Sequence, residues 1–256
     1  MRSTAGRLRA HFLLAALLPC TLLADDIVTV AVASNFAKTA AELSLAFREM
    51  AAVQVRISPG STGKLYAQII NGAPFDLFLS ADTERPLLLE KSGHAVNGSR
   101  QTYAIGSLVL WSRDERLRGR DCREVLERGD YLWLALANPK TAPYGAAARE
   151  FLEEASLWES ASQRAVFGEN IAQTLQFVAT GNATLGFVSL SQTTSPDLPA
   201  ATCTWTVPAT SRTSLHQQLV LLERARGNAG ARRFLEFLST PAAKKIIVRN
   251  GYRAPN

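Results

Sequence analysis

The sequence is poor in the residues that build metal centres. Its 256 residues include only three cysteines and three histidines. The histidines, His11, His94 and His216, lie far from one another and from the cysteines along the chain. The ligand spacings of structural and catalytic zinc sites are therefore missing. We expect that side chains of this protein bind no metal cation directly.

Long apolar runs are also scarce, and the one that stands out lies at the N-terminus. Residues 12–24 are largely apolar, three arginines precede them, and two aspartates follow. This order is typical of a secretory signal, and the run is too short to span a bilayer. We expect residues 1–24 to be a signal peptide and the mature chain to begin near Asp25. The alternatives are a membrane anchor and a lipid attached to Cys20, although Pro19 fits a lipoprotein site poorly.

The mature chain has no strong excess of one charge. Without the signal segment, 232 residues remain and the formal net charge falls from +6 to +3, because that segment carries three arginines. The remaining charges are scattered, and no basic stripe is interleaved with aromatic residues, so nucleic acid is a poor candidate for a partner. The length allows one large domain or two domains of roughly 100 residues, each with its own core.

Only two cysteines, Cys122 and Cys203, follow the signal segment. Such a pair in an exported protein can form a disulfide. The two lie far apart in the sequence, however, and show no framework spacing, so two free thiols fit the sequence equally well. The sequence does not choose between these alternatives.

The mature chain alternates predicted strands and helices, and its first unit shows the pattern. Residues 27–33 form a β-branched, apolar run typical of a strand covered on both faces. Asn35 stands at the N-cap position of the helix that follows. That helix is predicted from one apolar stripe, which contains Phe36, Ala40, Leu43, Phe47 and Met50.

Similar units recur along the chain. Further strands are predicted at 53–58, 75–81, 132–137 and 186–190, and further helices at 65–69, 146–158 and 171–178, with one more opened by Asp82 and Thr83. The helix at 65–69 is expected to stop at Asn71 and Gly72. Strands alternating with helices predict parallel sheets with helices on both faces. In such sheets, ligands bind beyond the carboxyl ends of the strands, where loops lead into helices.

The loops that lead into these helices are rich in small residues and hydroxyl groups. They are residues 34–35, 60–63, 80–82, 142–145 and 169–171, and none contains an arginine. The first N–H groups of a helix have no partner within it, and its start carries roughly half a positive charge. Four such starts together supply on the order of +2, which is enough to match a dianion.

A neutral site of this kind suits a fully ionised tetrahedral oxyanion better than a phosphate, whose remaining proton needs an acceptor. Ser, Thr, Asn and Gly are also common helix caps, and every doubly wound fold has such loops. Composition and spacing alone therefore predict an exported α/β protein with a crevice suited to an anion.

The stretch SPGSTGKL at 58–65 is open to more than one interpretation. A nucleotide-binding P-loop needs four residues between its glycines and a hydroxyl residue after its lysine. Gly60 and Gly63 are separated by only two residues, and Leu65 stands where the hydroxyl should be. The stretch therefore does not predict a nucleotide site.

A serine hydrolase is the second interpretation of the same stretch. Ser61 and Lys64 satisfy the pattern S-x-x-K, and residues 140–142 loosely resemble K-T-G. The pattern is weak, the S-D-N element is absent, and an alanine replaces the glycine of K-T-G. We therefore prefer a solvated helix lysine for Lys64 and an anion cradle for the stretch.

Six collinear segments resemble the periplasmic molybdate-binding proteins, the solute receptors of molybdate ABC importers. They are VTVAVASNF, GSTGKLYAQIINGAPFDLFLSAD, GSRQTYAIGSLVLWS, LALANPKTAPYGAAA, GENIAQTLQFVATGNATLGFVSLSQ and PAAKKIIVRNGY. The resemblance implies a periplasmic receptor that binds molybdate, and also tungstate, and delivers it to the membrane permease of an ABC transporter. It implies a monomer that is not an enzyme and needs no cofactor.

The resemblance also implies an α/β, two-lobed periplasmic-binding-protein fold of type II. Each lobe is expected to be a sheet flanked by helices, with two crossing strands as the hinge. The first lobe would contain residues 26–103 and 208–256, and the second lobe residues 104–207. Ligand would stabilise the closed form by binding to both lobes.

Residue by residue, the resemblance assigns ligand-binding positions. They are Ser34, Asn35, Ser61, Thr62, Ala81, Tyr144 and Ile171. Thr62 is expected to use its hydroxyl and its amide. Tyr144 and Ile171 are expected to use backbone N–H groups, as Ala81 would in some members.

One position departs from part of the family. Some members carry a tyrosine whose phenol reaches the oxyanion, and this chain has Ser189 there. Asn35, in the sequence SNF, is expected to supply the replacement donor.

Two alternatives to molybdate binding remain. Within the same class, the ligand could be another tetrahedral oxyanion such as sulfate, which has the same charge, so that only cavity size would discriminate. In a different class, the protein could be an exported serine hydrolase that uses Ser61 and Lys64. An effector domain of a regulator with the same fold is disfavoured by the signal segment and by the missing DNA-binding segment.

Overall fold

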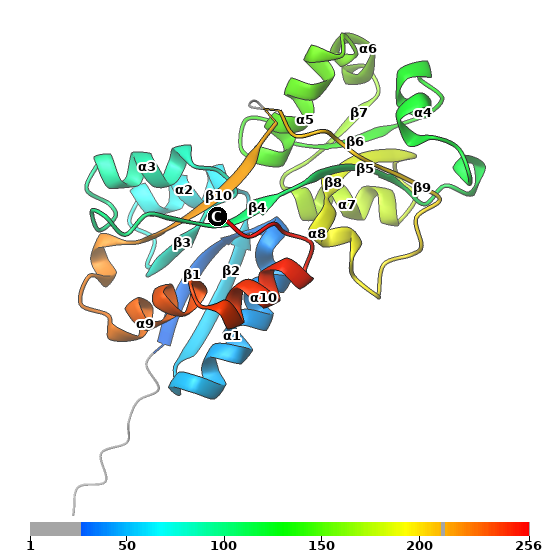
Figure 1. The fold of residues 1–256 in the computed structure, drawn as a ribbon. Helices are drawn as coiled ribbons and strands as arrows, with labels where there is room; N and C mark the ends of the chain where they lie inside the picture. Colours follow the sequence, from blue (N-terminus) through cyan, green and yellow to red (C-terminus); the bar gives the residue numbers. More distant parts are fainter. Residues whose placement is uncertain (1–26, 211–212, 256) are drawn as a thin grey trace, which may run out of the picture.

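A computed structural model describes residues 27–210 and 213–255. The predicted signal peptide at 1–24, and with it Cys20, lies outside the described residues. The described chain forms two lobes, each a five-stranded sheet with helices on both faces (Figure 1). The expected two-lobed α/β architecture is therefore confirmed.

The first lobe is built from both ends of the described chain. Its sheet has the order β2 (Gln54–Gly60), β1 (Ile27–Ala33), β3 (Leu77–Leu79), β10 (Leu215–Leu221) and β4 (Gln101–Gly106). One face packs on α1 (Ala37–Ala51), α9 (Ala229–Leu238) and α10 (Pro241–Arg249), and the other on α2 (Thr62–Ile70) and α3 (Glu84–Lys91). Two short 3-10 turns, η1 (Ser34–Phe36) and η3 (Glu223–Ala225), follow β1 and β10.

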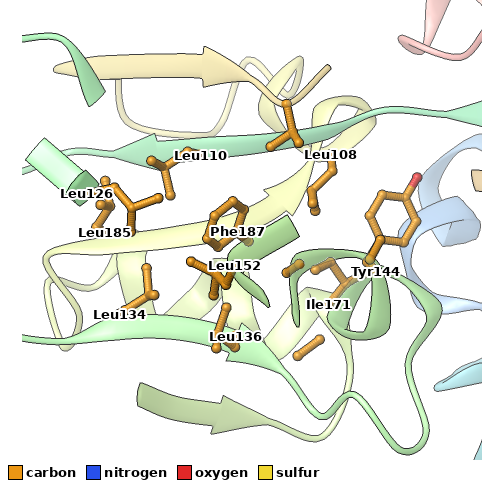
Figure 2. Packing of buried hydrophobic residues seen from close by; sticks show 14 of the residues in the cluster. Leu108, Leu110, Leu126, Leu134, Leu136, Tyr144, Leu152, Ile171, Leu185 and Phe187 are labelled. Carbon is orange, nitrogen blue, oxygen red and sulfur yellow. The ribbon is translucent and has the colours of Figure 1, made fainter. Parts of the chain in front are cut away.

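The second lobe is built from the middle of the chain. Its sheet has the order β7 (Ala165–Gly168), β6 (Leu134–Ala137), β8 (Leu185–Ser189), β5 (Leu108–Ser112) and β9 (Cys203–Thr206). One face packs on α4 (Cys122–Arg128), α5 (Pro143–Glu154) and α6 (Trp158–Ser162), and the other on α7 (Ile171–Ala179) and α8 (Leu190–Thr193). A 3-10 turn, η2 (Glu115–Leu117), follows β5. Figure 2 shows leucines of β5, β6 and α5 packed around Phe187 in this core.

The expectation of parallel sheets is correct for only part of each sheet. In the first sheet β10 runs antiparallel to β3 and β4, and in the second β5 runs antiparallel to β8 and β9. The chain enters the second lobe through β5 and returns to the first lobe through β10. Neither strand follows a crossover helix. The strands that do alternate with helices, β1, β2 and β3 or β6, β7 and β8, pair in parallel as expected.

The chain passes between the sheets twice. It leaves the first sheet after Gly106 and enters the second at Leu108, and it returns between Thr206 and Leu215. The predicted boundaries at 103/104 and 207/208 lie within a few residues of these passages. Backbone groups of Arg253 and Ile105 exchange two hydrogen bonds of 2.9 Å, so the C-terminal segment lies beside the first passage.

Two local predictions for the first helix were also wrong. Met50 is 70% exposed, because the last turn of α1 lies largely in solvent while Leu43 and Phe47 are buried. Asn35 does not cap α1 with its side chain; it lies inside η1, and Phe36 occupies the N-cap position. The predicted stop of α2 is confirmed, since Asn71 is the C-cap and Gly72 adopts a φ of +86°.

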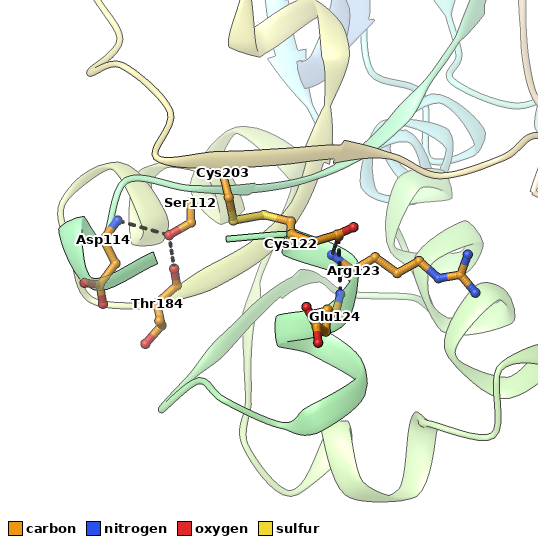
Figure 3. Close-up of a disulfide and its surroundings, with 8 residues drawn as sticks. Ser112, Asp114, Cys122, Arg123, Glu124, Thr184 and Cys203 are labelled. Carbon is orange, nitrogen blue, oxygen red and sulfur yellow. Dashed lines mark hydrogen bonds between the residues drawn. A yellow bond between two sulfur atoms is a disulfide. The ribbon is translucent and has the colours of Figure 1, made fainter. Parts of the chain in front are cut away.

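Cys122 and Cys203 form a disulfide that ties the start of α4 to the edge strand β9 (Figure 3). The two Cα atoms are 5.5 Å apart although 81 positions separate them in the sequence. Nearby, the Ser112 hydroxyl donates to the Thr184 carbonyl at 2.6 Å and so links β5 to the start of β8. Of the two alternatives for the cysteines, the structure has the disulfide.

Among residues 27–210 and 213–255, no helix combines the length and the apolar character that a membrane span requires.

Candidate ligand-binding site

A small cavity lies between the lobes, at the carboxyl ends of the parallel strands. All seven predicted site residues line it, together with Gly60, Ala142, Pro143 and Asn170. The first lobe contributes Ser34, Asn35, Gly60, Ser61, Thr62 and Ala81, and the second contributes the other five residues. Loops that are far apart in the sequence therefore meet at one point, as the carboxyl-end rule predicts.

Four helices or turns begin at this cavity: η1, α2, α5 and α7. The N-caps of α2 and α5 are Ser61 and Ala142, and neither side chain caps its helix. Asn170 caps α7 by accepting hydrogen bonds from Ala172 and Gln173, so the N–H of Ile171 is not used by the cap. The helix starts thus present backbone donors and partial positive charge to the cavity.

The Ser61 hydroxyl is the most informative group in the cavity wall. Its residue is only 4% exposed, and its oxygen has no hydrogen-bond partner within the described part of the chain. Buried hydroxyls are almost always hydrogen-bonded, because an unpaired one costs about 1–3 kcal/mol. A ligand in the cavity would provide the missing partner.

Thr62 and Ala81 are already in contact with each other. The Ala81 N–H donates to the Thr62 hydroxyl oxygen at 3.2 Å. This bond uses the backbone donor of Ala81 and leaves the hydroxyl hydrogen of Thr62 free to donate elsewhere. The geometry therefore favours Thr62 over Ala81 as a donor to a ligand.

Asn35 is oriented differently from the expectation of a side-chain donor. Its carboxamide nitrogen donates to Gln217 Oε1 at 2.9 Å and to the Tyr252 hydroxyl at 3.0 Å. Both of its N–H bonds are thus engaged away from the ligand. At the start of η1, the backbone N–H is the donor that Asn35 retains for the cavity.

The main chain of Tyr144 faces the cavity, while its ring lies behind the cavity wall. Figure 2 shows the phenol oxygen directed away from the leucine core of the second lobe. This oxygen accepts hydrogen bonds from Ser189 at 3.0 Å and from Gln217 at 3.2 Å. Burial raises the pKa of the Tyr144 phenol well above its ordinary value, so the group is neutral.

Ser189 is fully buried and does not line the cavity. Its hydroxyl bonds to Tyr144 and Ser191, and it caps the short helix α8. Ser189 is therefore part of the hydrogen-bonded support behind the cavity.

No charged side chain is among the described residues that line the cavity. Lys64 instead forms an ion pair of 2.9 Å with Glu169 of the second lobe, and both side chains are more than half exposed. The sequence suggested a solvated Lys64, whereas the structure shows this ion pair. No hydrogen bond joins Lys64 to Ser61 in the described chain. The arrangement lacks the nucleophile–base contact that a serine hydrolase requires.

The two lobes are in contact around the cavity. The Gly63 N–H donates to the Thr141 carbonyl of the second lobe at 2.8 Å. A Cβ on Gly63 would lie 3.0 Å from both the Cα and the carbonyl oxygen of Thr141, so the absence of a side chain permits this close approach. The two lobes are thus in direct contact beside the cavity.

The described residues contain no cluster of three or more His, Cys, Asp or Glu side chains placed to hold a metal ion. The cavity is instead lined by neutral hydrogen-bond donors, namely backbone N–H groups and hydroxyls. Such a set can bind an anion that carries no proton.

Several residues of this region were not predicted from the sequence. Gly60, Ala142 and Asn170 belong to loops that the sequence singles out, so the carboxyl-end rule could have included them. Gln217 and Tyr252 lie on elements with no local sign of a site, and only the folded chain brings them to Asn35.

Comparisons with known proteins agree with this geometry. Residues 28–253 match the family model described as bacterial extracellular solute-binding protein. The chain is 42% identical over 238 residues to the molybdate-binding protein ModA of Azotobacter vinelandii, which covers 93% of this chain and 94% of that protein. It is also 42% identical over 225 residues to ModA of Rhodobacter capsulatus, covering 88% and 87% of the two chains.

Solved structures show the same likeness. The periplasmic molybdate-binding protein of A. vinelandii superposes with a TM-score of 0.82 at 36% identity, covering 90% of this chain and 100% of that one. The sulfate-binding protein SubI of Mycobacterium tuberculosis has a TM-score of 0.69 at 14% identity, which shows a shared fold alone.

Proposed function

This chain belongs to the bacterial extracellular solute-binding proteins, and from that premise we propose that it is a periplasmic receptor for molybdate. The receptor would deliver the anion to the permease of an ABC transporter and act as a monomer, so that both lobes can face the permease. The relatives that establish the family of this chain are binding proteins rather than enzymes.

The cavity wall provides a physical basis for binding a dianion. Four helix starts of roughly half a charge each give on the order of +2. Ser61 and Thr62 would donate hydroxyl hydrogens, and the starts of η1, α5 and α7 would donate N–H groups from Ser34, Asn35, Tyr144 and Ile171. Because the donors of each lobe are held at the starts of helices, each half of the site would need little ordering on binding.

The absence of charged groups from the cavity wall supports selection against phosphate. Near neutral pH phosphate keeps a proton, which needs an acceptor, and no carboxylate is among the described lining residues. Sulfate carries no such proton, so its exclusion would depend on the size of the cavity when the lobes close. Tungstate has the charge and shape of molybdate, and we propose that the same cavity binds it.

The single observation that carries the proposal is the unpaired, buried Ser61 hydroxyl at the meeting point of the helix starts. The test is a calorimetric titration of the mature protein with molybdate, repeated in excess phosphate and then in excess sulfate. One-to-one binding of molybdate that persists in both is expected. Binding of sulfate without binding of molybdate would retain the anion site and reject its assignment.

A further inference from the structure

A buried carboxamide joins residues of both lobes behind the cavity. Gln217, on β10, is 0% exposed. Its Oε1 accepts hydrogen bonds from Asn35 at 2.9 Å and from the Tyr103 hydroxyl at 3.1 Å. Its Nε2 donates to the Tyr144 hydroxyl at 3.2 Å. One side chain thus connects the first lobe to the second.

The two ends of this connection reach the ligand site. Asn35 lines the cavity from the first lobe and Tyr144 lines it from the second, whereas Gln217 itself does not line it. The route from one half of the site to the other therefore contains two hydrogen bonds and a single intermediate residue. Tyr144 is suited to this position because its main chain lies at the start of α5 and its phenol reaches the passage between the lobes.

The surrounding backbone is shaped to accommodate the connection. A Cβ on Gly106, where the chain leaves the first sheet, would lie 2.1 Å from the Tyr144 hydroxyl and 2.7 Å from Gln217 Nε2. Only glycine leaves space there for the two side chains to meet.

The pairing of β10 with β4 is also irregular at this point. Gln217 pairs with Ala104 and Gln218 with Thr102, so Tyr103 is left as the extra residue of a bulge. Bulges re-aim side chains and recur next to functional sites. Here the single hydroxyl hydrogen of Tyr103 is shared between the Ser80 carbonyl at 3.0 Å and Gln217 Oε1 at 3.1 Å.

We propose that Gln217 is a positioning residue that fixes the spacing between the two halves of the ligand site in the closed receptor. This inference rests on the proposed function and adds a residue that determines affinity and size selection. A buried hydrogen-bond network that joins the two lobes favours one geometry, so it resists small changes of spacing. Because the cavity is small, a small change of spacing alters the fit of every donor to a tetrahedral anion.

The test compares three variants with the wild type. Gln217→Met keeps the length of the side chain and removes its hydrogen bonds. Tyr144→Phe removes only the hydroxyl that crosses between the lobes and keeps the backbone N–H at the cavity. Gln218→Met is the matched control, because Gln218 is the next residue on β10 and bonds to Thr102 and Arg100, which do not line the cavity.

Molybdate and sulfate affinities are measured by calorimetry at a temperature where circular dichroism shows each protein folded. Gln217→Met is expected to weaken molybdate binding at least tenfold and to lower the molybdate-to-sulfate preference at least threefold. Tyr144→Phe is expected to weaken molybdate binding about fivefold, and it remains informative if Gln217→Met does not fold. Gln218→Met should stay within twofold of the wild type in both affinities.

A purely structural role would lower the melting temperature without changing affinity or preference in the folded protein, and that result overturns the inference. A wild type that binds sulfate and not molybdate rejects the proposed ligand instead. The same variants are then compared on sulfate, where a loss confined to Gln217→Met and Tyr144→Phe would support the inference, and equal affinities would reject it.

Discussion

In the first lobe the cavity is lined by the hydroxyl residues Ser34, Ser61 and Thr62, whereas the second lobe lines it mainly with apolar residues such as Ala142 and Ile171. The second lobe can therefore contribute little besides its backbone N–H groups and the field of its helices. Side-chain hydroxyls are thus available as donors in the first lobe, whereas the donors of the second lobe are backbone N–H groups. Substitutions in the two lobes should differ accordingly.

The lobes differ in covalent support as well, since the disulfide lies entirely within the second lobe. Replacing Cys122 and Cys203 by serine should give the largest effect on stability. For a loop of 81 positions, the chain-entropy model predicts a loss of about 4.5 kcal/mol from the free energy of unfolding. Denaturant unfolding should show a separate, earlier transition for the second lobe. One unchanged transition would mean that this lobe does not depend on the disulfide.

Among variants that remove a single heavy atom, Ser61→Ala should weaken molybdate binding most. A hydrogen bond to a charged group contributes about 2 kcal/mol, so molybdate affinity should fall roughly 30-fold. The ligand-free protein should not lose stability, because the hydroxyl has no partner in the described chain.

The contrasting variant in the second lobe is Ile171→Val, which alters a side chain and keeps the backbone N–H. Calorimetry should find its molybdate affinity within about twofold of the wild type. If the two variants lost equal affinity, the division between side-chain and backbone contributions would be wrong.

Gly63→Ala tests how closely the lobes must approach. A Cβ there would require Thr141 to move by a few tenths of an ångström. We expect molybdate affinity to fall about fivefold, while the stability of the ligand-free protein is kept or raised, since alanine is favoured over glycine in a helix by up to about 1 kcal/mol. Titration and thermal unfolding of the same sample measure both quantities. Unchanged affinity would show that the contact does not limit closure.

A small effect, reduced by salt, is expected from the ion pair between Lys64 and Glu169. Exposed pairs contribute about 0–1 kcal/mol and are screened by salt. Lys64→Met should therefore weaken binding by no more than about fivefold at low salt, with a smaller effect at high salt. A loss of several orders of magnitude would instead assign Lys64 a direct role at the ligand.

Patterns among residues close in sequence predicted many of the strands, helices and loops. They missed the features that depend on contacts between residues far apart in the sequence. The first strand and the end of α2 follow from residues close in sequence, and the carboxyl-end rule places the seven predicted site residues in loops that line one cavity. The disulfide, the antiparallel direction of β10, and the bond from Asn35 to Gln217, 182 positions away, depend on long-range pairing. A buried glutamine on a strand gives no signal in the sequence until its partners are known.

The most direct test of the central claim is a crystal structure of the mature protein with molybdate. We expect one anion between the lobes, with an oxygen about 2.7–3.2 Å from the Ser61 hydroxyl and others at the backbone nitrogens of Tyr144 and Ile171. No lysine or arginine should contact it. An anion held by charged side chains, or bound outside this cavity, would contradict the claim.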